Sequence, residues 1–540
     1  MKKYIILLTV GLLLFGCSED FLDRYPTTKS VIESFYSTPD DGTEALTAAY
    51  NMLLRDDWWS PILYSEIQSD LCAGGAGSGD GGGFQRLDRA LQWPGGLAHQ
   101  EAWETYFGGI ARANLYLEYE SLIDWSGKEA MQLQYQAEAR FLRAYYHFIL
   151  TRLFGLIPIV DHQLADELLP RSSAEDLFTF ILDDLAFCAE HGLAAPYASI
   201  QEENWGRANK WAGMALFARV YLYYSGYYNS PTAGDYTAAT AREYVDNIID
   251  NSGYGLVNDF ASLWRVPAIS ELSTDLSLSG YAGEINQEVI WSIRYTYSPS
   301  YGDNHWQRLV GPRGFNIDPY GNGWGGMTVL PEFWNSFEAG DTRKTATILS
   351  FPDHPELSYD YVTQQQAQYT GYSYKKYEIV SIDSIPEPSP NWQFDGFEDF
   401  IVLRFADVLL MGAELHLNGG NTGTAVQYLN MVRDRAFGDN THNISGITVE
   451  NVMNERKHEL AGEGVWYYDL LRSVKGDFSK LADLLTYVDE NDDGDYSQTP
   501  DVTSLDVDGN NFVATRGLLQ IPQFELDLME GAIEQNPGYE

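Results

Sequence analysis

The stretch YQAEARFLRAYYHFILTRL, residues 135–153, decides the fold of this chain. Its apolar residues recur at a spacing of three and four, which places them on one face of an α-helix. The stripe consists of Phe141, Leu142, Tyr145, Tyr146, Ile149 and Leu153. Gly155 and Pro158 follow, as expected where a helix ends. The pattern therefore predicts a long helix whose aromatic face packs against neighbouring helices.

Similar periodicity recurs along the chain. Residues 211–224 (WAGMALFARVYLYY) place small Ala and Gly side chains among large rings. Further helices are predicted at residues 43–54, 101–122, 174–188, 238–250, 406–417, 424–436 and 449–460. Paired helices of this kind favour a mainly α fold with a tetratricopeptide-like scaffold of helix hairpins, although no strict repeat period is present.

Two regions lack the helical period. Residues 73–83 (AGGAGSGDGGG) contain seven Gly in eleven positions and predict a long loop. Residues 281–400 hold short β-like runs, such as residues 289–295, among many Gly, Pro, Tyr and Trp residues. We expect an irregular, loop-rich lobe with small β elements there, and such loops commonly carry function.

The charge of the chain excludes one class of partner. It has 540 residues, with 34 Lys and Arg against 77 Asp and Glu, for a net charge of −43. Such a surface repels phosphate backbones, so no nucleic-acid partner is expected. An aromatic content of 14% is too high for an acidic disordered chain.

The N-terminus resembles an export signal. Two Lys precede an apolar run at residues 4–15, which is too short to span a bilayer core of about 30 Å. Residues 1–16 are therefore predicted to be a signal peptide. The string Leu14-Phe15-Gly16-Cys17 resembles a lipobox, so Cys17 is predicted to carry a lipid, with residues 17–42 as a lipid-anchored N-terminal segment.

The other two cysteines, Cys72 and Cys188, are too few for a disulfide framework. Both are predicted to be buried apolar residues.

An acidic stretch at residues 489–495 (DENDDGD) alternates oxygen ligands around Gly494, as Ca²⁺ prefers. The candidate ligands are Asp489, Asn491, Asp493 and Asp495. Position 12 of the loop is Pro500 rather than Glu, so a regular EF-hand is not predicted. A calcium loop of another kind and a solvated acidic loop both fit this stretch.

Several strings along the chain, taken in order, resemble the motifs of one known family. They lie at residues 21–26 (FLDRYP), 140–146 with 154–158, 206–208, 286–290, 403–410, 455–472 and 521–539. The chain resembles the SusD/RagB glycan-binding outer-membrane lipoproteins of polysaccharide utilisation systems. The resemblance implies a scaffold of about four tetratricopeptide-like helix pairs that carries an irregular lobe.

The resemblance also implies a location, a function and an organisation. The protein would be lipid-anchored on the cell-surface side of the outer membrane. There it would bind a polysaccharide or oligosaccharide without cleaving it and pass it to a TonB-dependent, SusC-like transporter. The expected regions are a helical scaffold at residues 43–280, the candidate glycan-binding lobe at 281–400, and C-terminal helices with the acidic loop at 401–540.

Two other functions remain open from the residues alone: a surface glycoside hydrolase or lyase, and a transporter lid for nutrients that are not glycans. No catalytic motif is complete. His458-Glu459 begins a zinc-protease pattern, but Gly462 stands where the second His should be.

Charges in the C-terminal motif block lie in partly apolar helical sequence, where a buried charge persists only if it is paired. We therefore predict structural salt bridges rather than ligand contacts for Glu455, Arg456, Glu459 and Arg472.

A sugar ring offers an apolar face, which an exposed aromatic ring can cover, and a belt of hydroxyl groups for polar side chains. Suitable residues gather in two places. The first set, around the Gly-rich loop, contains Asp70, Arg86 and Trp93, with Trp58, Trp59 and Asp88 nearby. The second set contains Tyr301, Asn304, His305, Trp306, Arg308, Tyr320, Asn322 and Trp324. Trp306 and Trp324 are the predicted stacking platforms, although a core position fits any single Trp about equally well.

Overall fold

The computed structural model describes most of the chain after residue 34. The described residues are 35–54, 61–77, 82–88, 97–163, 168–270, 273–295, 306–381, 396, 398–482 and 509–539.

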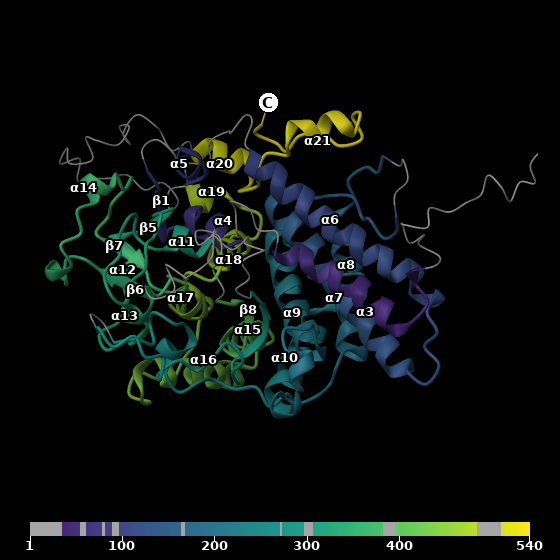
Figure 1. Cartoon of the computed structure of the whole chain (residues 1–540), viewed down its shortest axis with the longest axis horizontal. Helices are drawn as coiled ribbons and strands as arrows, with labels where there is room; N and C mark the ends of the chain where they lie inside the picture. The colour runs from purple at the N-terminus through teal and green to yellow at the C-terminus, as the bar shows by residue number, and fades with distance from the viewer. Residues whose placement is uncertain are drawn as a thin grey trace, which may run out of the picture.

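A row of packed helices forms one side of the molecule (Figure 1). It contains α3 (Pro39–Tyr50), α6 (Leu97–Tyr119), α7 (Glu129–Phe154), α8 (Ala174–His191), α9 (Lys210–Tyr227) and α10 (Ala238–Asn251). From α6 to α10 each helix packs against the next along the chain, and α3 packs against α6 and α7. The predicted stripe on α7 is fully buried, with no member more than 3% exposed.

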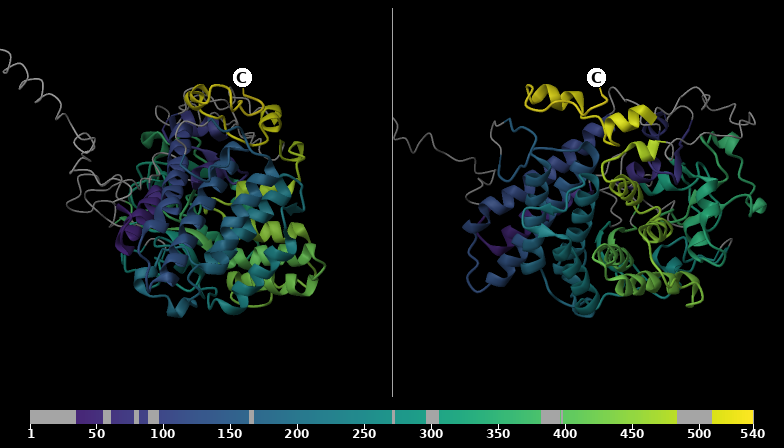
Figure 2. Two further views of the ribbon diagram at one scale, coloured as in Figure 1. Left: turned by 90° about the vertical axis from the view of Figure 1, so that its right-hand side faces the viewer. Right: turned by 180° about the vertical axis from the view of Figure 1, so that it is seen from behind.

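Four further helices lie between this row and the rest of the molecule, as both faces show (Figures 1 and 2). They are α15 (Phe405–Asn418), α16 (Thr422–Phe437), α17 (Val449–Leu460) and α18 (Trp466–Ser473). Helix α15 packs against α10 and α16, and α18 packs against α9. Every predicted helix is present, and the mainly α scaffold of helix hairpins is confirmed.

The opposite side is an irregular lobe held by two-stranded antiparallel sheets (Figure 1). The pairs are β1 (Cys72–Gly74) with β5 (Met327–Val329), β4 (Val289–Ile293) with β8 (Phe400–Arg404), and β6 (Ile348–Ser350) with β7 (Tyr372–Tyr374). A fourth pair, β2 (Thr232–Ala233) with β3 (Tyr236–Thr237), precedes α10. The small β elements of the prediction are therefore confirmed.

Short helices complete the molecule. They are α4 (Pro61–Ile67), α5 (Gly82–Asp88), α11 (Trp306–Val310), α12 (Pro331–Ser336), α13 (Arg343–Thr347), α14 (Tyr361–Gln364), α19 (Ser479–Ala482), α20 (Gly509–Thr515) and α21 (Gln523–Leu528). Within the described residues, no helix has both the length and the apolar character that crossing a membrane requires.

A buried network of ion pairs joins the C-terminal helices to β8. Arg404, at the end of β8, is 1% exposed and contacts three carboxylates. Its Nη1 lies 2.9 Å from Glu288 and 2.5 Å from Glu459, and its Nε lies 2.7 Å from Glu463. Arg343 joins the same network through Glu455 at 2.6 Å and Glu459 at 3.0 Å.

A second part of this network lies between α15, α17 and α18. Arg456 contacts Asp407 and Asp469, each at 2.7 Å. Arg472 contacts Asp469 at 2.7 Å and Glu414 at 2.6 Å. The predicted pairing of the charges in the motif block is thus confirmed.

Two acids of the network, Glu459 and Asp407, are held in the charged form. Burial opposes ionisation of Glu459, but Arg435, Arg404 and Arg343 outweigh it and keep the pKa of Glu459 below its usual range. Asp407 behaves alike: burial is outweighed by Arg219 and Arg456, so its pKa is also low. These are scaffold contacts, and they leave the residues concerned unavailable to a ligand.

Both described cysteines confirm the prediction, since Cys72 and Cys188 are buried and free.

Candidate functional site

The fold brings one segment from each of the two predicted sets of sugar-binding residues side by side. Strand β1, which begins the Gly-rich segment, pairs with β5 in the register Cys72↔Val329, Ala73↔Thr328 and Gly74↔Met327. Helix α5 packs against β1 and carries Arg86, while Trp324 lies three residues before the start of β5. The surface over β1, β5 and α5 is therefore the candidate site.

The Gly-rich segment is more ordered than the predicted loop, because residues 72–74 form β1 and residues 82–88 form α5. Close backbone approach explains the glycines. A Cβ on Gly74 would collide with the backbone of Phe84, and one on Gly75 would collide with the carbonyl oxygen of Gly325. Gly74 and Gly75 thus allow the backbone of β1 and the residue after it to approach α5 on one side and the loop before β5 on the other.

Trp306 is not the sugar platform that the sequence predicts. Its side chain is 1% exposed, and its ring packs edge-on against Tyr377 and Phe400 at centroid distances of 5.1 and 5.7 Å. All five residues of α11 are buried, although the sequence around Trp306 is polar. The polar residues next to Trp306 in the sequence do not indicate exposure, because every residue of this short helix is buried.

Arg308 and Tyr320 are also corrected. Arg308 is 2% exposed, and its Nη1 donates to the carbonyl oxygen of Asn322 at 3.0 Å. Tyr320 is fully buried in a small second core, where its ring lies 5.8 Å from Phe315. Both residues support the lobe and are not presented to a ligand.

Five described residues of the predicted sets are not buried, and two of these, Asp88 and Asn322, are half-buried. Trp324 is half-buried, and its backbone N–H donates to the carbonyl oxygen of Arg308 at 2.5 Å, which holds the loop before β5. Arg86 is exposed on α5. Asp70 is half-buried, with Oδ1 accepting a hydrogen bond from Trp466 Nε1 at 2.6 Å.

Sequence reasoning missed one charged neighbour of Asp70. Lys457 Nζ, on α17, lies 3.8 Å from Asp70 Oδ2. The sequence gives no indication of this contact, because Lys457 lies in the C-terminal motif block, far from Asp70 along the chain. Lys457 adds a cation at the edge of a strongly acidic molecule.

Other predicted residues lie outside the described residues. They are Cys17, Trp58, Trp59, Trp93, Tyr301, Asn304, His305, Asp489, Asn491, Asp493 and Asp495. Within the described residues, no group of three or more His, Cys, Asp or Glu is arranged to hold a metal ion.

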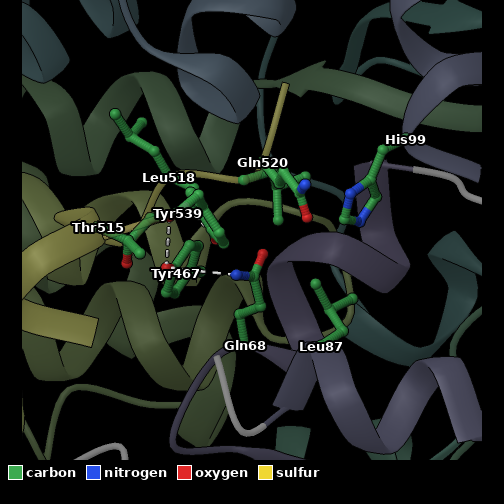
Figure 3. A pocket seen from close by; sticks show the side chains of 10 residues that line it. Gln68, Leu87, His99, Tyr467, Thr515, Leu518, Gln520 and Tyr539 are labelled. Carbon is green, nitrogen blue, oxygen red and sulfur yellow. Dashed lines mark hydrogen bonds between the residues drawn. The ribbon is translucent and has the colours of Figure 1, made fainter. Parts of the chain in front are cut away.

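A small pocket beside the candidate site is too narrow for a sugar. It has a volume of about 20 Å³, which fits one water molecule. Tyr467 is one of its lining residues (Figure 3), and its hydroxyl donates to the carbonyl oxygen of Gly517 at 2.8 Å and accepts from Gln68 Nε2 at 3.5 Å.

Glu66, a buried acid on α4, lies shortly before Asp70 and β1 in the sequence. Burial raises its pKa from 4.5 to about 7, although hydrogen bonds from Tyr374 and Gly464 favour the charged form. Between pH 4.5 and pH 7 the native state therefore holds a proton that the unfolded chain has released. The contribution of this proton to the free energy of unfolding is complete at low pH and is lost as the pH rises towards 7.

We expect Glu66→Gln to stabilise the protein at pH 8, by up to about 3 kcal/mol, because the neutral amide avoids the buried charge. Below pH 4.5 the two proteins should have similar free energies of unfolding. Urea unfolding at pH 4.5 and pH 8 measures the difference. A difference that does not change with pH would contradict the raised pKa.

Comparisons with known proteins cover nearly the whole described chain. A family model described as "SusD family" matches residues 356–539, and one described as "Starch-binding associating with outer membrane" matches residues 83–222. A SusD-like protein of Bacteroides ovatus is 26% identical, over 87% of this chain and 82% of the relative. The starch-binding protein SusD of Bacteroides thetaiotaomicron is 24% identical, over 67% of this chain and 68% of that protein.

Solved structures share the fold. Surface glycan-binding protein A from Bacteroides fluxus is 25% identical and has a TM-score of 0.74, covering 93% of this chain and 100% of that one. The protein of the same name from Bacteroides thetaiotaomicron, solved in complex with laminarihexaose, is 22% identical with a TM-score of 0.72 and the same coverage. At that identity the second likeness concerns the fold alone.

Proposed function

Because this chain belongs to the SusD/RagB family, we propose that it is a non-catalytic, cell-surface protein that binds a glycan and passes it to a transporter. The observation that carries the proposal is the full-length likeness to a surface glycan-binding protein. The glycan would be a polysaccharide or oligosaccharide, and the transporter a TonB-dependent, SusC-like protein of the outer membrane.

The geometry supports a site over β1, β5 and α5. The half-buried Trp324 lies at one end of the β1–β5 pair, and the exposed Arg86 lies on α5, which packs against β1. Asp70 lies at the other end of the pair, so it would contact a distant unit of a longer glycan and not the ring that Trp324 covers. This arrangement suits a glycan, whose sugar rings need aromatic and polar contacts.

Anchoring belongs to the same proposal. A lipid on Cys17 would hold this acidic protein at the outer membrane through burial of its acyl chains, which electrostatics could not do. One of the matching family models is described as associating with the outer membrane, in agreement with this location.

Affinity electrophoresis of residues 18–540 tests the binding role. We expect one polysaccharide in the native gel to retard the protein, with no release of reducing ends. Cleavage would instead support the hydrolase or lyase function. Mobility that is unchanged in every gel, together with co-purification of the transporter, would support a lid for nutrients that are not glycans.

We also propose that Asp489, Asn491, Asp493 and Asp495 bind Ca²⁺ as a structural ion. An ion that binds only the folded protein must raise its stability. The melting temperature should therefore rise when Ca²⁺ replaces a chelator, and this rise should vanish in Asp493→Asn/Asp495→Asn. An unchanged melting temperature in the parent protein would refute the site.

A further inference from the structure

A pocket of about 290 Å³ lies between α12, α16 and α17, apart from the surface around Trp324. Its volume is near the lower limit of ordinary small-molecule sites and is far larger than a single water requires. The loop between α16 and α17 closes one side through the half-buried Ile444, and Leu429 of α16 lies behind the pocket as a core residue.

Helix α17 presents one face to this pocket. Asn451, Asn454 and His458 are spaced by three and four residues, so they lie in a row along the helix. The neighbouring Glu459 points to the buried ion network instead, where it contacts Arg404. The side chains of His458 and Glu459 therefore lie in different places, one at the pocket and one in the buried ion network, and do not form a shared metal site.

The charged groups of the pocket are already paired. Arg433 lies 2.9 Å from both Glu338 and Glu455, and Lys457 lies 3.8 Å from Asp70. An ionic ligand would therefore meet no uncompensated charge of opposite sign. It would also lose its own hydration on entry, which disfavours charged ligands.

The uncharged polar side chains of α17, in contrast, can still form hydrogen bonds to a ligand. The side chain of Asn454 is exposed and makes no hydrogen bond within the described part of the chain. Asn451 uses its Oδ1 to cap the helix, which leaves its Nδ2 protons for a ligand.

His458 contributes an acceptor. Burial and the nearby Arg343 lower its pKa to about 3, so its imidazole is neutral at pH 7. The hydroxyl of Ser336 donates to the carbonyl oxygen of Phe333 at 2.8 Å, so His458 Nε2, 2.9 Å away, must donate to Ser336. Nδ1 is then the unprotonated nitrogen, able to accept a hydrogen bond from a hydroxyl group.

We propose that this pocket binds one uncharged, hydroxyl-rich unit such as a neutral hexose, through Asn451, Asn454 and His458, with Ile444 against its apolar face. It is a second binding site, independent of the surface around Trp324. Amide and imidazole groups beside one aliphatic side chain match the alternating polar and apolar surface of such a unit.

Saturation-transfer NMR on the mature chain tests the site, with glucose, galactose and mannose as probes and galacturonate and glucosamine as charged counterparts. We expect a millimolar response from at least one neutral hexose and at least a tenfold weaker one from the charged sugars. Asn454→Trp, which fills the pocket, should weaken hexose binding at least tenfold. The matched control, Asn418→Trp, exposed at the end of α15, should leave it unchanged.

Thermal melting shows whether each variant folds. Asn454→Ala removes the amide without adding bulk, and it should also weaken hexose binding. The proposed pocket would be overturned by no response to any neutral hexose, by equal binding in Asn454→Trp, or by charged sugars that bind as well as neutral ones. Trp324→Ala separates the two sites. Loss of the hexose response in that variant would assign it to the Trp324 surface, whereas loss of polysaccharide binding alone supports two sites.

Discussion

Replacing Arg404 by leucine is expected to destabilise the protein by about 3–5 kcal/mol, because it removes a buried cation shared by three buried carboxylates and leaves their negative charge only partly compensated. Glu288, Glu459 and Glu463 all contact this guanidinium at 2.9 Å or less, and each is at most 4% exposed. A typical domain is stable by only about 5–15 kcal/mol, so this loss is a large part of the total. Urea unfolding at pH 7 measures it.

Arg140→Leu is the matched control. Its ion pair with Asp184 is longer, at 3.4 Å, and the Arg140 side chain is 36% exposed. A partly solvated pair of this kind contributes at most about 1 kcal/mol. Equal losses in the two variants would show that burial of the Arg404 network does not govern its energetics. Arg404→Lys should fall between them, since one ammonium cannot reproduce the planar contacts.

Trp324→Ala is expected to weaken glycan binding tenfold or more while the protein stays folded. Covering an aromatic face of this size is worth about 1.5–3 kcal/mol, and a tenfold change in affinity corresponds to about 1.4 kcal/mol. Affinity electrophoresis across a range of polysaccharide concentrations measures the change.

Two other tryptophans serve as controls for this result. Trp205, 38% exposed in the loop before α9, lies outside the proposed site, and Trp205→Ala should bind normally. Trp306 is a core residue, so Trp306→Ala should cost about 3–5 kcal/mol of stability. Full affinity in Trp324→Ala, or a loss confined to Trp205→Ala, would place the glycan elsewhere.

The helical scaffold could be predicted because its determinants are local. The stripe on residues 135–153 marks a buried face by its period alone, and α7 (Glu129–Phe154) contains it. Helix ends differ from the prediction by a few residues, as at α6 (Leu97–Tyr119), because the apolar period does not mark the terminal turns, and a short 3-10 turn at Glu120–Leu122 continues the helix.

The candidate site could be predicted only in part. Composition singled out two segments that the fold places side by side, since the Gly-rich stretch and the residues around Trp324 meet at the β1 and β5 pair. It could not separate Trp324 from Trp306, because both have polar or Gly neighbours in sequence. Their burial depends on what packs against them, and for Trp306 this is Tyr377 and Phe400, both distant in sequence.

The sequence by itself determined the mainly α class, the acidic surface, the paired charges of the C-terminal motif block and the family. These follow from periodicity, composition and local strings. Only the tertiary structure decided which aromatic rings are accessible, which cations neutralise Glu459, and that Asn451, Asn454 and His458 border one pocket. The reason is physical: exposure and electrostatic environment are set by contacts between distant segments, and these contacts exist only once the chain has folded.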